Sequence, residues 1–166
     1  MLKHVLVPLD SSTLAEQALA HAQSLLETGG KISLVMAVEV PATSAPGLYP
    51  AFGTIPLLSY EELKEEMSNE ALTYLEHVAA NQRENGFDSD TRVQLGDPAA
   101  VIIDAARELH VEAIVMSTHG RSGLSRWLFG SVANKVLSAA PCPIYLIPSK
   151  VQQRKASRET AEMHYG

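Results

Sequence analysis

Hydrophobic and polar positions follow two different periods along this chain of 166 residues. Short, nearly all-apolar runs occur at His4–Leu9, Ile32–Val38, Glu112–Met116 and Pro143–Ile147, and Thr91–Leu95 is a further short strand of more mixed composition. Such runs, rich in β-branched side chains, are typical of strands buried on both faces. Between them, apolar residues recur three or four positions apart, which is the spacing of an amphipathic helix. The pattern therefore predicts five strands alternating with four helices.

Local signals mark where the predicted helices begin and end. Thr13 with Glu16, and Ser59 with Glu62, form capping boxes that open the first two helices. The third helix starts at Asp97-Pro98 and the fourth runs from Ser131 to about Ala140. Gly29-Gly30 and Gly86 are expected to end the first and second helices. The core-facing positions are Leu14, Ala18, Ala22, Leu25, Leu63, Met67, Ala71, Leu75, Val78, Ile102, Ile103, Ala106 and Leu109.

Alternating apolar strands and helices predict an α/β domain, a doubly wound five-stranded parallel sheet with helices on both faces. The pattern leaves the strand order open. It places the domain at residues 1–148 and predicts a disordered polar tail at 149–166. The connection Pro41–Leu58 is long and rich in Pro, Gly and Ala, as lids and interaction segments are. Ligands are expected outside the carboxyl ends of the strands, at the topological switch point.

Composition and charge narrow the classes of partner. No apolar run approaches the ~20 residues of a membrane span, so no membrane insertion is expected. The net charge of −6 argues against nucleic acid or anionic lipid as a main partner. Cys142 is the single cysteine, which excludes an internal disulfide, and the first residues are typical of a strand rather than a signal peptide. We therefore expect a cytoplasmic protein.

Three strand ends carry residues that are not apolar: Pro8-Leu9-Asp10, Gly96-Asp97-Pro98 and Ser117-Thr118-His119-Gly120. After the last of these, Gly130-Ser131 stands at the start of a helix, where free N–H groups and the helix dipole favour an anion. A phosphate site would use the glycine for close approach and the hydroxyl for contact. The alternative is that Gly120 only turns the chain and Ser131 only caps the helix, and spacing alone does not separate the two.

The segment from His119-Gly120 to Gly130-Ser131-Val132 resembles the nucleotide-binding signature of the universal stress protein family. That signature is Gly, two residues, Gly, nine residues, Gly, then Ser or Thr. Val5–Asp10, Gly96-Asp97-Pro98 and Pro141–Leu146 are similar to the family's first strand, third-strand turn and last strand. The resemblance covers Met1 to about Pro148, and it implies a Rossmann-like fold of the adenine nucleotide alpha hydrolase type.

The resemblance implies an ATP site, with ADP or AMP as alternatives and Mg²⁺ carried by the nucleotide. Asp10, after Pro8 and Leu9, would hold the ribose or adenine side, and Val38 would meet the adenine through its backbone. Met116 would line the pocket, while His119, Gly120 and Arg121 would lie near the phosphates. Gly130, Ser131 and Val132 would cradle those phosphates. The signature's first glycine is Ser117 here, which adds a side chain where close approach and a positive φ are expected.

The resemblance also implies a nucleotide-dependent module for signalling or protection under stress, with at most slow ATP hydrolysis. A homodimer through the apolar edge strand Ile144–Ile147 is expected, together with a separate protein partner. The alternative within the same fold is an ATP-independent dimeric interaction module. Gly130-Ser131 lacks the lysine of a P-loop NTPase.

Phospho-receiver and flavodoxin-like domains share the alternating pattern. The first expects paired acidic residues after strand 1, where this chain offers Asp10 alone, and Asp10 would repel the phosphate that the second binds there. His119 has no metal ligand or catalytic partner at suitable spacing, and Cys142 is expected to be a core residue rather than a nucleophile.

Overall fold

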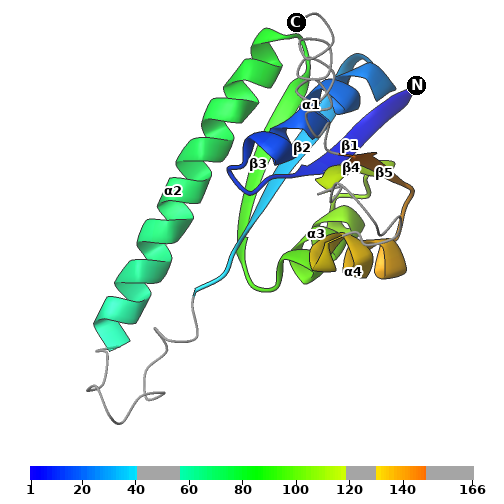
Figure 1. Cartoon of the computed structure of the whole chain (residues 1–166). Helices are drawn as coiled ribbons and strands as arrows, with labels where there is room; N and C mark the ends of the chain where they lie inside the picture. The colour runs from blue at the N-terminus through cyan, green and yellow to red at the C-terminus, as the bar shows by residue number, and fades with distance from the viewer. Residues whose placement is uncertain (41–56, 119–129, 149–166) are drawn as a thin grey trace, which may run out of the picture.

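The computed structural model describes residues 1–40, 57–118 and 130–148, and the side chains of 57–59 are not among those described. The predicted alternation of strands and helices is confirmed. The elements are β1 (Leu2–Pro8), α1 (Thr13–Leu25), β2 (Leu26–Val38), α2 (Leu57–Glu84), β3 (Asp88–Leu95), α3 (Pro98–Glu108), β4 (Ala113–Thr118), α4 (Ser131–Ala139) and β5 (Ile144–Pro148) (Figure 1). Within the described ranges, no helix is both long enough and apolar enough to cross a bilayer.

The five strands form one parallel sheet in the order β3-β2-β1-β4-β5. β1 lies in the centre, with β2 on one side and β4 on the other, so the chain reverses its winding direction between β1 and β4. This is the doubly wound fold that the alternation predicts, and it puts the switch point at the carboxyl ends of these two strands. β5 lies at an edge of the sheet, as expected.

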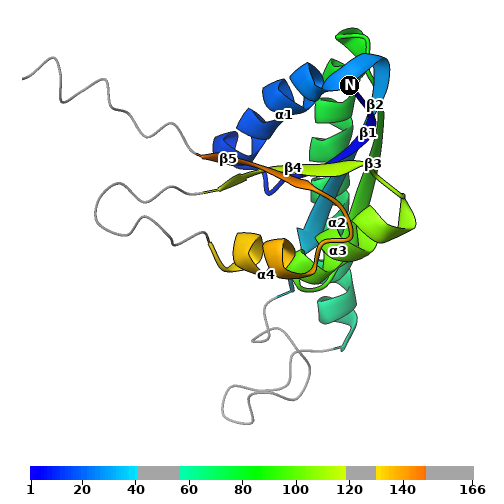
Figure 2. The same cartoon turned by 90° about the vertical axis from the view of Figure 1, so that its right-hand side faces the viewer.

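Each face of the sheet is covered by a pair of helices, because the strands are apolar on both sides. Val5, Val7 and Val115 pack with buried residues of α1 and α2, such as Ala18 and Leu75. Leu6, Val35, Ile114 and Met116 point the other way and pack with α3 and α4, through Val101, Ile102, Ala133 and Val136 among others. Figure 2 shows α1 on one side of β4 and β5, with α3 and α4 on the other.

Hydrogen bonds correct the predicted start of α1. The cap is Ser12 and not Thr13: Ser12 Oγ accepts a hydrogen bond from the Ala15 N–H at 3.0 Å. Thr13 is the first helical residue and is exposed. The prediction failed because a capping box at Thr13 and a serine cap one residue earlier look alike in sequence. The neighbouring turn decides between them, since Asp10 Oδ1 accepts from the Ser12 N–H and hydroxyl and so fixes the serine.

The predicted end of α1 at Gly29-Gly30 is also wrong. α1 ends at Leu25, and the two glycines lie inside β2, which begins at Leu26 rather than near Ile32. A Cβ on Gly30 would lie 3.0 Å from Leu26 Cβ and from the Glu27 carbonyl oxygen. The glycine therefore permits a tight irregularity in the strand, where the pairing of β1 with β2 shifts register between Leu2 and His4.

Four other predicted boundaries move in the structure. α2 begins at Leu57, so Ser59 is not its cap, and Leu57 and Leu58 belong to the helix although Leu58 was predicted to lie in the loop Pro41–Leu58. β3 begins at Asp88, because polar residues are tolerated in a strand at the sheet edge. β4 continues through Ser117 and Thr118, although the predicted strand ended at Met116. β5 covers Ile144–Pro148 rather than starting at residue 143.

The predicted start of α3 is confirmed. Asp97 Oδ2 accepts from the Ala100 N–H at 3.1 Å, and Pro98 is the first helical residue. Lys135 of α4 donates to Asp97 Oδ1 at 2.8 Å, and this ion pair, with the Ala100 bond, holds the pKa of Asp97 below its usual range. Gly96 precedes the cap with φ +138°, a conformation that requires glycine. Ile103 is half-buried, and Val101 takes the fully buried place beside Ile102.

A polar network lies near the amino ends of the first three strands. His4 Nε2 lies 2.8 Å from Ser33 Oγ, and Lys31 Nζ pairs with Asp90 Oδ2 at 2.6 Å. Burial of the imidazole, followed by the nearby Lys31 ammonium, lowers the pKa of His4 below its ordinary value. The carboxylates of Asp88, Asp90 and Glu112 oppose this shift without cancelling it.

The cap assignment predicts different effects for two neighbouring substitutions. Ser12→Ala should lower the free energy of unfolding by about 1 kcal/mol, because an orphan N–H of α1 loses its acceptor. Thr13→Ala should change it by less than about 0.5 kcal/mol, since Thr13 is exposed. Urea denaturation of the two variants measures both values. An equal or larger loss in Thr13→Ala would contradict the assignment.

The His4 environment predicts a loss of stability in mild acid. Because the folded chain disfavours protonated His4, the unfolded chain binds this proton more readily as the pH falls below about 6.5. The free energy of unfolding should therefore decrease between pH 7 and pH 5.5, above the range in which the carboxylates titrate. Denaturation at the two pH values should show a smaller decrease for His4→Gln than for the wild type. His77→Gln, at an exposed position on α2, is the control and should keep the wild-type decrease.

Candidate functional site

A cavity of about 470 Å³ opens at the carboxyl ends of β1 and β4, beside the first turns of α1 and α4. Its volume lies in the range of small-molecule sites. The lining residues are Pro8, Leu9, Asp10, Ser12, Leu14, Ala15, Val35, Ala37, Glu39, Pro98, Ile102, Met116, Ser117, Thr118, Gly130, Ser131, Val132 and Ala133. The cavity therefore lies at the switch point, where the sequence predicts a ligand.

The turn after β1 presents the Asp10 carboxylate at the edge of this cavity. Asp10 Oδ1 accepts hydrogen bonds from the Ser12 N–H, at 3.0 Å, and from the Ser12 hydroxyl. Ser11 between them has φ +62°, an uncommon conformation for a residue with a side chain. Asp10 therefore has a structural role in this turn, besides its place at the cavity. Asp10 orients the true cap, and this same contact fixes the direction of its carboxylate.

The first turn of α4 offers backbone donors to the cavity. Gly130 is the cap and makes no side-chain capping bond, and the first intrahelical bond of α4 runs from the Asn134 N–H to the Gly130 carbonyl at 3.0 Å. The N–H groups of Ser131, Val132 and Ala133 come before that bond, and all three residues line the cavity. Ser131 is exposed and does not cap, which removes the alternative that it serves only as a helix cap. This helix end can hold an anion.

Two hydroxyl groups at the end of β4 are buried without a partner. Within the described ranges, neither Ser117 Oγ nor Thr118 Oγ1 makes a hydrogen bond. Ser117 lies in the strand and does not have the positive φ expected at the signature's first glycine. The serine is therefore accommodated by ordinary backbone, and the objection from a positive φ does not hold. Buried polar groups left unpaired are uncommon and point to a strained or ligand-binding position.

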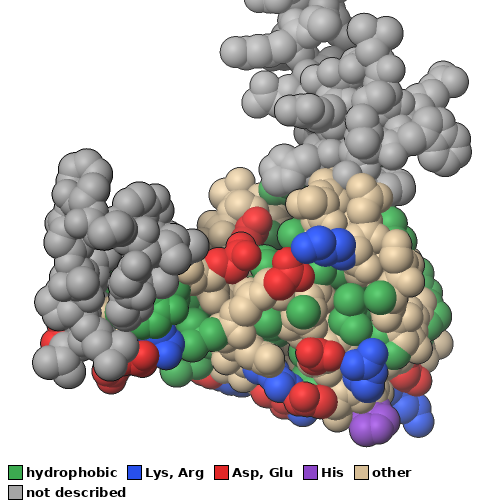
Figure 3. Space-filling view, turned by 90° about the horizontal axis from the view of Figure 1, so that it is seen from below, with side chains coloured by type: hydrophobic (Ala, Val, Ile, Leu, Met, Phe, Trp, Pro, Cys, Tyr) green, Lys and Arg blue, Asp and Glu red, His purple; other side chains and the backbone are tan. Residues whose placement is uncertain are grey.

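Two of the described lining residues are charged, Asp10 and Glu39, and both are acidic. No lysine or arginine is among the described lining residues. Lys135 is close in sequence but is paired with Asp97, which raises the pKa of Lys135. On the face seen from below, acidic and basic side chains lie next to one another rather than in a patch of one sign (Figure 3). The positive end of the cavity is therefore the amino terminus of α4.

The structure brings together most of the residues that the sequence predicts for the site. Those that line the cavity are Pro8, Leu9, Asp10, Met116, Ser117, Gly130, Ser131 and Val132. Val38 does not line it: its side chain is buried in the core and its carbonyl accepts from the Gly96 N–H, while Ala37 and Glu39 face the cavity. His119, Gly120 and Arg121 lie outside the described residues.

Sequence reasoning named Thr118 only as part of the strand end Ser117-Thr118-His119-Gly120 and gave it no role, and it missed the residues that α1 contributes. Thr118 follows an apolar run and directly adjoins Ser117, so a polar residue ending a strand at the switch point was an available signal. Ser12, Leu14 and Ala15 reach the cavity because α1 crosses over β1 and β4, and no local pattern reveals that contact.

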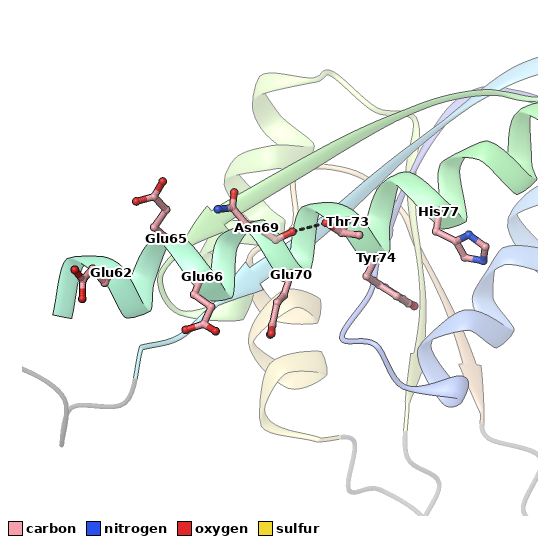
Figure 4. Close-up of a pocket in the computed structure, with 8 residues that line it drawn as sticks. All are labelled: Glu62, Glu65, Glu66, Asn69, Glu70, Thr73, Tyr74 and His77. Atoms are coloured by element: carbon pink, nitrogen blue, oxygen red, sulfur yellow. Dashed lines mark hydrogen bonds between the residues drawn. The ribbon is translucent and has the colours of Figure 1, made fainter. Parts of the chain in front are cut away.

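A second hollow follows the surface of α2. It is lined by Glu62, Glu65, Glu66, Asn69, Glu70, Thr73, Tyr74 and His77, all from this one helix. Figure 4 shows their side chains pointing in different directions, with Thr73 donating to the Asn69 carbonyl. The four glutamates would repel a phosphate. This hollow is a groove along a helix and does not have the convergent polar groups of a binding site.

Two further kinds of chemistry find little support in the described ranges. No group of three or more His, Cys, Asp or Glu side chains in them is arranged to hold a metal ion. Cys142 is half-buried, and burial raises the pKa of its thiol, so the reactive thiolate is disfavoured.

Comparison with known proteins places the chain in a family. A model of the universal stress protein family matches residues 1–148. The chain is 34% identical over 146 residues to a universal stress protein of Methanocaldococcus jannaschii, covering 87% of this chain and 81% of the relative. It is 28% identical over 147 residues to universal stress protein YxiE of Bacillus subtilis, covering 89% and 99% of the two chains.

Solved structures show the same fold. Universal stress protein UspA from Lactobacillus plantarum matches with a TM-score of 0.66 at 21% identity, covering 88% of this chain and 97% of that one. A universal stress protein in complex with cAMP matches with a TM-score of 0.63 at 18% identity, with 88% and 97% coverage. A family protein from Arabidopsis thaliana with AMP bound matches at 0.58 and 17% identity, with 88% and 91% coverage. By its sequence match and its fold, the chain belongs to the universal stress protein family.

Proposed function

We propose that the cavity binds an adenine nucleotide, with ATP as the expected ligand and ADP or AMP as alternatives. The observation that carries this proposal is the uncapped first turn of α4, which faces the same cavity as the buried hydroxyls of β4. Backbone N–H groups at a helix start, in a cavity that also contains an unpaired hydroxyl donor on the same face, match the needs of a phosphate. The AMP and cAMP complexes of structural relatives support an adenine nucleotide as the class of ligand.

The lining residues suggest how the nucleotide would lie. Its phosphates would contact Gly130, Ser131 and Val132, and by family resemblance Gly120 and Arg121 as well. The ribose and adenine would lie toward Asp10 and the end of β2, over Met116. Mg²⁺ would enter with the triphosphate, bound to its phosphate oxygens.

Binding rather than fast catalysis fits the described lining residues. They include no lysine, histidine or cysteine that could act on a phosphoryl group. The protein would act in the cytoplasm as a nucleotide-dependent module in the stress response. The nucleotide would change the population of conformations, which requires that it bind one of them more tightly than another.

A homodimer through β5 is part of this proposal. β5 lies at the edge of the sheet and pairs with β4 on its inner side. Its side chains are only partly covered, and Tyr145 is 39% exposed. An apolar edge strand that is left open favours pairing with another chain.

A second candidate is an interaction module of the same fold that works without ATP. It is favoured by one observation, the absence of a lysine or arginine among the described residues that line the cavity. The two candidates differ in whether the cavity holds a nucleotide, and they share the dimer.

The first experiment is to purify the protein without added nucleotide, denature it, and identify the released small molecules by chromatography and mass spectrometry. ATP, ADP or AMP in near-stoichiometric amount is expected. A protein that releases no nucleotide and also fails to bind added ATP in calorimetry would favour the interaction module.

Gly130→Val should remove nucleotide binding without unfolding the domain. Gly130 has φ −57°, which valine tolerates, and no atom of the described residues would lie within 4 Å of an added Cβ. The valine would instead occupy the place where a phosphate approaches α4. ATP affinity measured by calorimetry should fall at least about 100-fold, which corresponds to about 2.7 kcal/mol.

The matched control is Ala139→Val, which also introduces a valine, at the other end of α4, where the residue is exposed. This variant should leave ATP affinity unchanged. Circular dichroism should show that both variants fold. Wild-type ATP affinity in Gly130→Val would contradict the placement of the phosphates.

Tyr145→Lys should convert the dimer to a monomer, because a charge on the open edge strand opposes pairing with a second copy. Sedimentation velocity over a range of concentrations measures this change. Leu72→Lys, at a position on α2 with 42% exposure, is the control and should remain dimeric. A wild-type protein that stays monomeric at high concentration would rule out the proposed dimer.

A further inference from the structure

Thr118, the last residue of β4, carries a hydroxyl group that the fold leaves unsatisfied. The residue is 6% exposed, and Oγ1 has no hydrogen-bond partner within the part of the chain that the structure describes. A buried hydroxyl without a partner lowers stability, whereas a valine of nearly the same shape would fill this position without that cost. Because the residue lines the cavity, a bound ligand can supply the missing partner.

The alternation of β4 places the hydroxyl on a particular side of the sheet. Ile114 and Met116 pack among residues of α3 and α4, and Val115 packs on the opposite face with α1 and α2. Successive side chains of a strand point to opposite faces, so Thr118 lies on the face of Met116. That face also carries the first turn of α4, through the buried Ala133.

Thr118 and α4 together form a group of donors. Three backbone N–H groups of α4, from Ser131 to Ala133, come before its first intrahelical bond and line the same cavity as Thr118. An anionic oxygen that accepts several hydrogen bonds is the complement to such a group. A ribose hydroxyl or a ring nitrogen would satisfy these donors less well.

We propose that the Thr118 hydroxyl donates a hydrogen bond to a phosphoryl oxygen of the nucleotide held at α4, and so makes the cavity select phosphorylated ligands over the free nucleoside. This inference rests on the proposed nucleotide site and adds a specificity residue to it. Ser117 has an unpartnered hydroxyl as well, but it points to the face of α1, away from the α4 donors. Of these two hydroxyl groups, only that of Thr118 therefore contacts the phosphoryl oxygen.

The test compares the affinities of the full chain for ATP, AMP and adenosine by calorimetry. Thr118→Val should lower the affinities for ATP and AMP about 10- to 100-fold, the range expected for a hydrogen bond to a charged group. Its affinity for adenosine should change less than about twofold. Thr118→Ser keeps the hydroxyl and should keep the preference for the phosphorylated ligands.

A readout without ligand separates this role from a structural one. Thr118→Val should melt at the wild-type temperature or above it, because the hydroxyl that it removes has no partner. The matched control is Thr91→Val on β3, which removes a hydroxyl that donates to Glu76 Oε1 far from the cavity. That variant should melt at a lower temperature and bind ATP as the wild type does.

The outcomes distinguish this inference from the proposed function. A wild type that binds neither ATP nor AMP overturns the proposed function and the inference with it. If the wild type binds both nucleotides, either of two results overturns the inference alone. In the first, Thr118→Val binds ATP and AMP as tightly as the wild type does. In the second, its affinity for adenosine falls as much as its affinities for ATP and AMP. If Thr118→Val does not fold, Thr118→Ser and Thr118→Ala provide the same test, since they differ from one another only by the hydroxyl.

Discussion

The pairing of β1 with two parallel neighbours is the constraint on which the rest of the structure depends. β2 pairs with β1 on one side and β4 pairs with it on the other, and the helices that follow them cover opposite faces of the sheet. The helices α1 and α4, which follow β1 and β4 in the chain, therefore lie on opposite faces and leave a space at the carboxyl ends of these two strands. The cavity occupies this space, and its polar groups come from the residues where these strands stop.

The two ends of the sheet have different chemistry, although the same strands build both. At the amino ends, His4, Ser33, Lys31 and Asp90 satisfy one another through hydrogen bonds and an ion pair. At the carboxyl end of β4, two buried hydroxyls have no partner among the described residues, and the first turn of α4 has no side-chain cap. This difference between the two ends, within the described residues, is what the proposed ligand site depends on.

Asp10 shows how the site and the local structure share one residue. Its carboxylate fixes Ser12, and Ser12 caps α1. The first turn of α1 carries Glu16, which accepts a hydrogen bond from the Tyr74 hydroxyl of α2 at 2.7 Å. Burial of the phenol raises the pKa of Tyr74, and the hydrogen bond to Glu16 raises it further. Contacts at the cavity are thus continuous with the packing of α1 against α2.

The sequence by itself determined the element order, the parallel class of the sheet, the start of α3 at Asp97 and eight of the residues that line the cavity. These features follow from apolar periodicity and local capping signals, which act over short stretches of chain, and from the family resemblance. Tertiary structure decided the strand order, the cap at Ser12 and the position of Gly29-Gly30 inside β2. It also decided that Ala37 and Glu39 rather than Val38 face the cavity, and that the Thr118 hydroxyl is buried beside α4. These depend on contacts between residues far apart in the chain, where packing and burial, not local propensity, choose among conformations that the sequence alone allows equally.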